Sequence, residues 1–211
     1  MNPVAWLELP CGVQLHHLRI ALDGRPNDGA YRVLDASERD RAERFHRNED
    51  RQRFMQTRVA LRRLLGERLA MDPAAVAFIT VGRGRPVLAG SASSAGLHFS
   101  VSHAGEHAMV ALADRPLGVD VEIVRSEAWS PTMAALVLSA DELGFIAAEP
   151  EPDLAFFRCW TRKEAYVKTG HQGLSDGLRN VSLTPGPGPA GYLIVDRTLE
   201  AGVHVACAVK G

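Results

Sequence analysis

A faint internal repeat constrains the fold of this chain more than any other feature of its sequence. The run LDASE at 34–38 is matched by LSADE at 138–142, and HAMVAL at 107–112 is matched by HVACAV at 204–209. The matches are short, but they occur in the same order, with a long helical segment between them in each half. This order predicts an α+β fold of two similar α/β lobes, residues 1–115 and 116–211, related by a pseudo-two-fold axis. Because ligand pockets often form between domains, we expect the active site in the cleft between the lobes.

The composition excludes several classes of protein. The 211 residues include 24 Lys and Arg against 25 Asp and Glu, a balance that gives no general reason to bind nucleic acid. No apolar run approaches the roughly 18 residues of a membrane span, and we expect no secretory signal. The three cysteines are scattered, which argues against a disulfide framework or a structural zinc site and favours a reducing compartment. We therefore expect a cytoplasmic monomer that binds neither nucleic acid nor membrane.

Hydrophobic periodicity and turn residues predict secondary structure along most of the chain. Asp35 with Glu38, and Ser139 with Glu142, have the spacing of a capping box at a helix N-terminus. The predicted helices cover 36–70, 131–137, a segment that starts at 139, and 154–169. The predicted strands cover 13–20, 76–82, 97–102, 107–113, 117–124, 180–183, 192–195 and 203–209, with glycine-containing loops at 82–86 and 90–96.

Two acids alternate with aliphatic residues in the predicted strand 117–124. Alternate side chains of a strand share one face, so Asp120 and Glu122 project together, about 7 Å apart along the strand. Two carboxylates aimed at one point repel each other and need a cation, and oxygen ligands suit a hard ion such as Mg2+. The same pattern also fits a half-exposed strand that carries two solvated acids, so both interpretations stay open.

The predicted helix 154–169 places Trp160, Glu164 and Lys168 on one face, because they are spaced by four residues. One interpretation is an ordinary surface triplet, whose Glu–Lys pair contributes only ~0.3–0.5 kcal/mol. The other is a catalytic face with a third metal ligand and cations for phosphate. The chain has only three lysines, and Lys163 and Lys168 both lie here, which favours function because lysine offers a compact point charge.

Further polar groups precede these two segments. In FSVSH at 99–103, the Ser100 and Ser102 hydroxyls share one side of a strand and His103 stands at its end, which indicates a phosphate contact or a hydrogen-bonded turn. The loop GRGRP at 82–86 lacks the ending of a phosphate-binding P-loop, yet its two guanidiniums can clasp a phosphate. No G-x-S-x-G motif occurs, so a hydrolase triad is not indicated. The arginines of 38–68 fit the solvated face of an amphipathic helix.

In this order, the segments resemble the 4′-phosphopantetheinyl transferase superfamily, in particular its two-lobed, Sfp-type branch. The resemblance is carried by GVDVE at 118–122 and WTRKEAYVK at 160–168, with GRP at 84–86, FSVSH at 99–103 and the arginine-rich 41–54 upstream. It covers roughly residues 34–183. The internal repeat agrees with it, since this branch is similar to two fused copies of a smaller trimeric synthase subunit.

The resemblance implies transfer of the phosphopantetheine arm of coenzyme A to a serine of an apo acyl or peptidyl carrier protein, with release of 3′,5′-ADP. It implies a Mg2+ site of Asp120, Glu122 and Glu164, with Glu164 as the base for the serine proton and Asp120 as second choice. It also implies that Lys168 steadies the leaving phosphate. The remaining coenzyme A contacts would be Arg41 at the 3′-phosphate, with Arg39 as a weaker candidate, and Arg85, Ser102, His103 and Lys163.

The chain departs from the family pattern at three places. Arg85 stands where relatives usually have lysine, Glu38 stands where some have a basic residue, and GHQGL at 170–174 lacks the usual basic residue. Two other functions stay open. A non-catalytic module that binds coenzyme A or a carrier protein would need a broken acid triplet, and the triplet is intact. A Mg-dependent nucleotidyltransferase would also use paired acids, but it would label its product with nucleotide.

Overall fold

The computed structural model describes residues 5–9, 12–23, 31–82, 84–126, 129–170, 178–200 and 202–211, without the side chains of 5–8 and 91. The strands are β1 (Ala5–Leu9), β2 (Val13–Arg19), β3 (Phe78–Val81), β4 (Arg85–Leu88), β5 (His98–Ala104), β6 (His107–Ala113), β7 (Leu117–Ile123), β8 (Tyr192–Glu200) and β9 (Val203–Lys210). The helices are α2 (Ala36–Glu43), α3 (Asn48–Leu69), α4 (Pro131–Val137), α5 (Ala140–Ala148) and α6 (Pro152–Lys168). Three short 3-10 turns cover Pro73–Ala75, Gly90–Ser94 and Leu178–Asn180.

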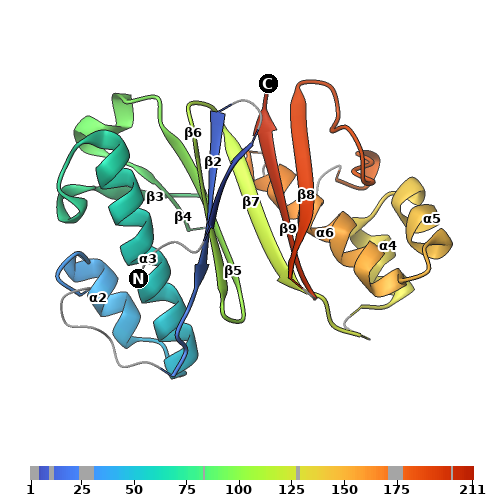
Figure 1. Ribbon diagram of the computed structural model, residues 1–211, viewed down its shortest axis with the longest axis horizontal. Helices are drawn as coiled ribbons and strands as arrows, with labels where there is room; N and C mark the ends of the chain where they lie inside the picture. Colours follow the sequence, from blue (N-terminus) through green and yellow to red (C-terminus); the bar gives the residue numbers. More distant parts are fainter. Residues whose placement is uncertain are drawn as a thin grey trace.

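The strands form two larger antiparallel sheets and one hairpin. One sheet has the order β1-β2-β6-β5, the other has the order β7-β9-β8, and β3 pairs with β4. In the first sheet, β2 pairs with β6, and β6 pairs with β5. In the second sheet, β7 pairs with β9, and β9 pairs with β8. The two sheets therefore share one order of pairing. Figure 1 shows the two sheets side by side in the middle, with α2 and α3 on one side and α4, α5 and α6 on the other. The predicted mixture of helices and strands is confirmed.

The two sheets bury a common apolar core. Side chains of β2 and β6, including Leu15 and Met109, cluster with Val119 and Val121 of β7 and with Val205 of β9. The outer face of each sheet is covered by its long helix, with α3 against β6 and α6 against β9. Each half therefore buries its sheet on both faces, which explains why β6 and β9 are apolar along nearly their whole length.

Both predicted capping boxes are present. The Asp35 side chain accepts from the backbone N–H of Glu38, and Glu38 accepts from that of Asp35. Ser139 and Glu142 make the same reciprocal pair at the start of α5. These local signals therefore placed two helix starts correctly, because the hydrogen bonds that make a cap lie within four residues of one another.

Several predicted elements differ from those observed. The single helix predicted for 36–70 is broken between α2 and α3. At the break, the ring of Phe45 packs against that of Phe54, with the ring centroids 5.6 Å apart. The strand predicted for 180–183 is absent from this described segment, because side chains from elsewhere take up its backbone groups: the Lys163 ammonium binds the Val181 carbonyl, and Glu142 accepts from the Leu183 N–H. Strands β1 and β4 were not predicted.

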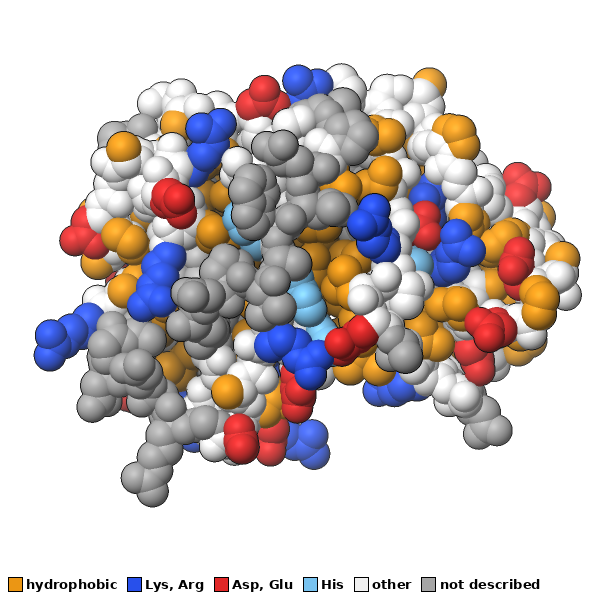
Figure 2. Space-filling view, viewed as in Figure 1, with side chains coloured by type: hydrophobic (Ala, Val, Ile, Leu, Met, Phe, Trp, Pro, Cys, Tyr) orange, Lys and Arg blue, Asp and Glu red, His pale blue; other side chains and the backbone are white. Residues whose placement is uncertain are grey.

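Two surface properties bear on function. Within the described residues, no helix combines the length and the apolar character needed to cross a bilayer. On the face shown in Figure 2, and outside its grey residues, positive and negative side chains are interspersed, in line with a net charge of -1.

Candidate active site

Strand β7 presents its two acids away from the core between the sheets, as its alternating pattern predicts. Val119 and Val121 face that core, whereas Asp120, only 4% exposed, and the half-buried Glu122 point to the other side. Gly118 lets α6 pack directly on this side, because a Cβ at Gly118 would lie 2.0 Å from the Ala165 carbonyl oxygen. The interpretation as two solvated surface acids is therefore wrong for Asp120.

Asp120 is the centre of the polar contacts at this site. Its Oδ1 accepts from the Ser102 hydroxyl at 2.7 Å and from the Lys168 ammonium at 2.7 Å. The same ammonium donates to the Val119 carbonyl at 3.1 Å. Oδ2 of Asp120 is buried and has no partner among the described residues. A buried carboxylate oxygen without a donor is costly, so this atom is suited to a ligand that the polypeptide does not supply.

The other two carboxylates lie within electrostatic reach of Asp120. Burial and the negative charge of Asp120 raise the pKa of Glu122, although Trp160 donates a hydrogen bond to its Oε1 at 3.4 Å. Burial and the same charge raise the pKa of Glu164, and Lys168 offsets part of this effect. The negative charge of Asp120 therefore adds to burial in destabilising Glu122 and Glu164 as anions, an effect that a bound cation would reverse.

These acids are not gathered as a finished metal site. Among the described residues, no group of three or more His, Cys, Asp or Glu side chains is placed to hold an ion as it stands. The donor set nevertheless fits Mg2+, because all donors are carboxylate oxygens and one oxygen of Asp120 is buried without a partner. Residues Asp120, Glu122 and Glu164 are the side chains that would hold the ion.

A pocket of about 280 Å³ opens beside Asp120. Its ionisable lining residues are all basic: Arg41 of α2, Arg58 of α3, His103 of β5 and Lys168 of α6. Ser102 also lines it. The structure therefore brings Arg41, the adjacent Ser102 and His103, and Lys168 from three distant parts of the sequence to one pocket suited to an anion.

Lys163 was predicted to contact phosphate, and the structure contradicts this. Its side chain is 0% exposed, and its ammonium lies 3.0 Å from Glu142 and donates to the carbonyls of Leu178 and Val181, each at 2.7 Å. All three donors of the ammonium are engaged, so none is left for a ligand. Lys163 is a structural residue that fastens α5 and the chain after α6 to α6.

Two other predicted contacts, Arg39 and Arg85, lie outside the pocket lining. Arg39 donates to the Leu34 carbonyl. Gly84 and Pro86 line the pocket but Arg85 between them does not, and its charge instead adds to burial in lowering the pKa of His98. Most of the 170–174 segment, from 171 onwards, lies outside the described residues.

The pocket also contains residues that the sequence analysis missed. Phe54, Thr57, Arg58 and Leu61 line it from one face of α3. Their spacing of three and four residues along a helix was a usable signal. The arginine-rich stretch that contains Arg58 hides this spacing, because its arginines are expected as a group on a solvated helix face.

The buried thiols do not provide a nucleophile. Burial raises the pKa of Cys159 to about 12, with a smaller contribution from Glu142, and burial alone raises the pKa of Cys207 to about 12. Both remain protonated at neutral pH and are closed to a substrate. Neither thiol can therefore serve as the nucleophile of a reaction at this site.

Comparison with known proteins agrees with this site. Residues 116–208 match the family model of the 4′-phosphopantetheinyl transferase superfamily, and residues 27–115 match that of the 4′-phosphopantetheinyl transferase N-terminal region. The chain is 32% identical over 191 residues to the 4′-phosphopantetheinyl transferase HetI of Nostoc sp. strain PCC 7120, covering 85% of this chain and 81% of that one.

Two Bacillus proteins match over shorter stretches. Identity to the 4′-phosphopantetheinyl transferase psf-1 of Bacillus pumilus is 32%, over 65% of this chain and 58% of the relative. Identity to the 4′-phosphopantetheinyl transferase Sfp of Bacillus subtilis strain 168 is 24%, over 77% of this chain and 71% of the relative. With the acids of β7, the face of α6 and the basic pocket in place, the chain belongs to the 4′-phosphopantetheinyl transferase superfamily of enzymes.

Proposed function

We propose that this protein transfers the 4′-phosphopantetheine arm of coenzyme A to a serine of an apo acyl or peptidyl carrier protein. The serine oxygen forms a bond to the phosphorus that carries the pantetheine arm, and the pyrophosphate bond to the adenosine phosphate breaks. The leaving group is 3′,5′-ADP, which takes the electron pair. The observation that carries this proposal is the unpartnered Oδ2 of buried Asp120 at one end of a pocket whose charged lining residues are all basic.

We assign the metal to Asp120, Glu122 and Glu164. A Mg2+ ion held there would supply positive charge to the pyrophosphate of coenzyme A. The raised pKa values of Glu122 and Glu164 support this assignment, because each reflects burial first and then the negative charge of Asp120.

Lys168 and Glu164 have separate tasks in this mechanism. Lys168 lines the pocket and contacts Asp120, so its ammonium is placed to stabilise charge on the leaving phosphate. Glu164 is assigned to accept the serine proton, since this half-buried carboxylate lies on the same face of α6 as Lys168, one turn before it. Asp120 is the second choice, because its Oδ1 already accepts two hydrogen bonds.

The basic residues of the pocket bind the phosphates of coenzyme A. Arg41, Ser102 and His103 retain this role because they line the pocket. Arg85 is not assigned to a phosphate, since it lies beside the pocket rather than in its lining. Burial lowers the pKa of His103, and Arg53 and Lys168 add to the effect, so a hydrogen bond rather than a full charge is its expected contribution at neutral pH.

We also propose that the halves are two lobes related by a pseudo-two-fold axis, with the site in the cleft between them. The shared strand orders and the paired capping boxes support this arrangement. Lys168 from the second half shares one pocket with residues of the first half, so a single chain supplies the whole site. A monomer is therefore sufficient for activity, and the free buried thiols Cys159 and Cys207 fit a cytoplasmic protein.

The decisive experiment is a transfer assay read by mass spectrometry. The protein is incubated with coenzyme A, Mg2+ and apo carrier proteins from fatty acid, polyketide and nonribosomal peptide assembly. A carrier that gains the mass of one phosphopantetheine arm supports the proposal. A carrier that gains a nucleotide identifies a nucleotidyltransferase, and binding of coenzyme A without any gain in mass identifies a non-catalytic module.

A further inference from the structure

A polar cluster closes one end of the apolar core between the two sheets. His17 shares a face of β2 with Leu15, and Leu15 belongs to this core. His107 shares a face of β6 with Met109 of the same core. Glu200 ends β8 of the other sheet, and Figure 1 shows the β5–β6 and β8–β9 turns at the same end of the two sheets. The cluster therefore joins the two halves of the molecule.

The two imidazoles of this cluster contact each other. Nε2 of His17 lies 3.0 Å from Nδ1 of His107, and the rings are stacked with their centroids 5.2 Å apart. On its other side, Nε2 of His107 lies 3.1 Å from Oε1 of Glu200. The same oxygen accepts a hydrogen bond from Arg19 at 2.7 Å. Since His107 is only 5% exposed, a continuous chain of polar contacts runs from the first sheet through a buried ring to the second.

The carboxylate fixes which ring nitrogens carry protons. An ionised carboxylate only accepts hydrogen bonds, so Nε2 of His107 carries the proton that faces Glu200. A neutral His107 then has a bare Nδ1, and His17 donates to it from Nε2. Burial is the largest cause that lowers the pKa of each histidine below its ordinary value of 6.5. Both rings are therefore neutral at neutral pH, and the hydrogen bond between them is intact.

Protons taken up in mild acid act against this arrangement. The first proton enters at Nδ1 of His17 and leaves the hydrogen bond between the rings in place. The second proton enters at Nδ1 of His107, where it faces the N–H of His17 across 3.0 Å. Two donors cannot form a hydrogen bond, and two imidazolium charges repel each other. The doubly protonated pair must therefore separate.

The surrounding charges balance one imidazolium but not two. Among the described residues, the charged groups that act on the pair are Arg19 of β2, Glu106 of the β5–β6 turn and Glu200 of β8. The two acids favour the protonated histidines, and Arg19 opposes them. Arg19 lies 2.7 Å from Glu200 and 3.6 Å from Glu106, so it offsets part of their charge. Together the three groups carry one net negative charge.

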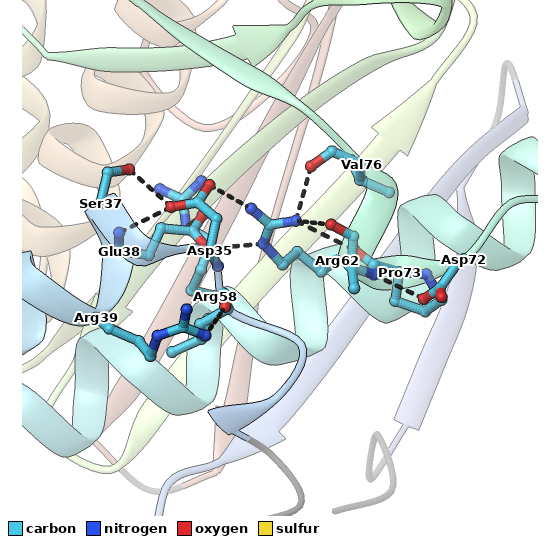
Figure 3. Close-up of polar contacts among 11 residues, drawn as sticks. Asp35, Ser37, Glu38, Arg39, Arg58, Arg62, Asp72, Pro73 and Val76 are labelled. Carbon is cyan, nitrogen blue, oxygen red and sulfur yellow. Dashed lines mark hydrogen bonds and ion pairs between the residues drawn. The ribbon is translucent and has the colours of Figure 1, made fainter.

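The cluster around Arg62 of α3 provides a contrast. Figure 3 shows Arg62 bound to Asp35 and Glu38, which lie at the start of α2. A guanidinium stays charged throughout the physiological pH range, whereas an imidazole ordinarily changes its charge near pH ~6.5. Mild acid therefore leaves the guanidinium of Arg62 unchanged but alters the contact between His17 and His107.

We propose that His17, His107 and Glu200 form an acid-sensitive junction, which holds the two halves together at neutral pH and loosens as the histidines take up protons. The pocket draws Lys168 from the second half and His103 from the first, so a loosened junction also lowers activity. The proposal goes beyond the transfer reaction, because the three residues of the junction lie outside the pocket lining.

The first test is urea unfolding of the full chain between about pH 5 and pH 8. Below pH ~6.5 the folded pair binds fewer protons than the unfolded pair, so the wild type loses stability as the pH falls. His17→Gln keeps a donor for His107 but does not titrate, and its amide can turn its oxygen toward a protonated His107. We expect the unfolding constant of the wild type, relative to that of His17→Gln, to rise about 10-fold between pH ~7.5 and pH ~5.

A second variant should act in the opposite direction. Glu200→Gln removes a negative charge that favours the protonated pair, so its unfolding constant should rise more steeply in acid than that of the wild type, by a further 2-fold to 5-fold or about that. Glu200 is 47% exposed, so this variant decides the matter if His17→Gln does not fold. The matched control is His46→Gln, at an exposed position between α2 and α3, which should keep the pH dependence of the wild type.

Transfer assays over the same pH range test the link to the pocket. His17→Gln should retain about 3-fold more of its kcat/KM than the wild type when the pH is lowered from ~7.5 to ~5.5. An equal loss of kcat/KM in both proteins, despite different unfolding curves, overturns this link. A wild type that transfers nothing at any pH contradicts the proposed function, and the unfolding curves still judge the junction.

Three results from unfolding overturn the junction itself. The first is an equal pH dependence of the unfolding constant in the wild type and His17→Gln. The second is a Glu200→Gln protein whose stability falls no more steeply in acid than that of the wild type. The third is a His46→Gln control that shows the same change as His17→Gln, since the effect would then belong to any histidine of the chain.

Discussion

The two halves of the molecule bury the same polar arrangement with different cations. In the first half, the capping-box Glu38 of α2 binds Arg62 of α3, which also donates to the carbonyls of Pro73, Ala74 and Val76. In the second half, the capping-box Glu142 of α5 binds Lys163 of α6, which also donates to two carbonyls after that helix. In each half, the cation on the long helix thus binds two other segments. One is the capped helix before the long helix, and the other is the chain that follows the long helix.

The two halves differ in how the second oxygen of the capping-box carboxylate is used. Both oxygens of Glu142 are used inside the fold, one near Lys163 and the other by the Leu183 N–H at 2.9 Å. Glu38 keeps one oxygen for Arg58, which lines the pocket. The second-half arrangement is therefore purely structural, whereas the first-half arrangement extends to the pocket. This comparison also explains why Lys163, although it stands inside the family motif, corresponds to Arg62 rather than to Lys168.

The largest expected effect is on stability, from Lys163→Met. This change leaves the buried Glu142 without its cation and should lower the free energy of unfolding by about 3–5 kcal/mol in urea denaturation. Arg62→Met should have an effect of the same order in the first half, because Arg62 is 1% exposed and equally committed. A Lys163→Met protein that keeps its stability but loses transfer activity would break the comparison and restore a phosphate contact for Lys163.

The second prediction separates catalysis from binding. Asp120→Asn should fold normally and lower kcat at least about 10²-fold, because it weakens the proposed metal site. Excess EDTA should abolish wild-type activity, and added Mg2+ should restore it. Arg41→Gln, from the first half, should instead raise the KM for coenzyme A. Full activity of the wild type in EDTA would exclude the metal assignment.

The third prediction distinguishes the two lysines of α6. Lys168→Arg should lower kcat about 10-fold or more with an unchanged melting temperature. The ammonium is fitted between the Asp120 carboxylate and the Val119 carbonyl, and a planar guanidinium is too large for that position. Lys210→Arg, at an exposed position of β9, is the matched control. Wild-type rates in both variants would show that Lys168 acts only as a positive charge.

The smallest expected effect concerns the pH dependence of stability. Burial by itself would raise the pKa of Asp196, but the His204 ring at 3.3 Å, the hydrogen bond from Arg162 and the arginine charges hold it below its ordinary value of 3.8. A carboxylate with a depressed pKa stabilises the folded state above its unfolded pKa and loses this effect as the pH falls through the folded one. Asp196→Asn should therefore cost about 1.5–3 kcal/mol at pH 7, and the difference from wild type should shrink below pH ~4.

Asp35 is the matched position in the first half. Hydrogen bonds from Ser37 and from the Glu38 backbone outweigh burial and lower its pKa, with a smaller contribution from the Arg62 charge, but its side chain is 43% exposed. Solvent screening should make Asp35→Asn less costly than Asp196→Asn, whose side chain is 9% exposed. The two variants are compared by urea unfolding between pH 3 and pH 7. An equal cost for both would show that burial does not set the size of the effect.

Local sequence patterns determined part of this protein. The capping boxes at Asp35 and Ser139, the alternation of β7 and the shared face of Trp160, Glu164 and Lys168 were all predictable. Each depends on backbone geometry within a few residues, and that geometry is the same in any protein. The pattern of acids and of the α6 face also carried the family resemblance.

Tertiary structure decided which charged side chains are buried and which meet a ligand. Lys163 and Lys168 are both basic residues of one helix, and only the packing of α5 against α6 encloses the first and leaves the second at the pocket. Packing likewise selected Arg58 from an arginine-rich helix and gave the backbone of 180–183 to Lys163 and Glu142 instead of a strand. The physical reason is that the burial and pairing of a charge depend on partners from distant parts of the chain, which local periodicity does not encode.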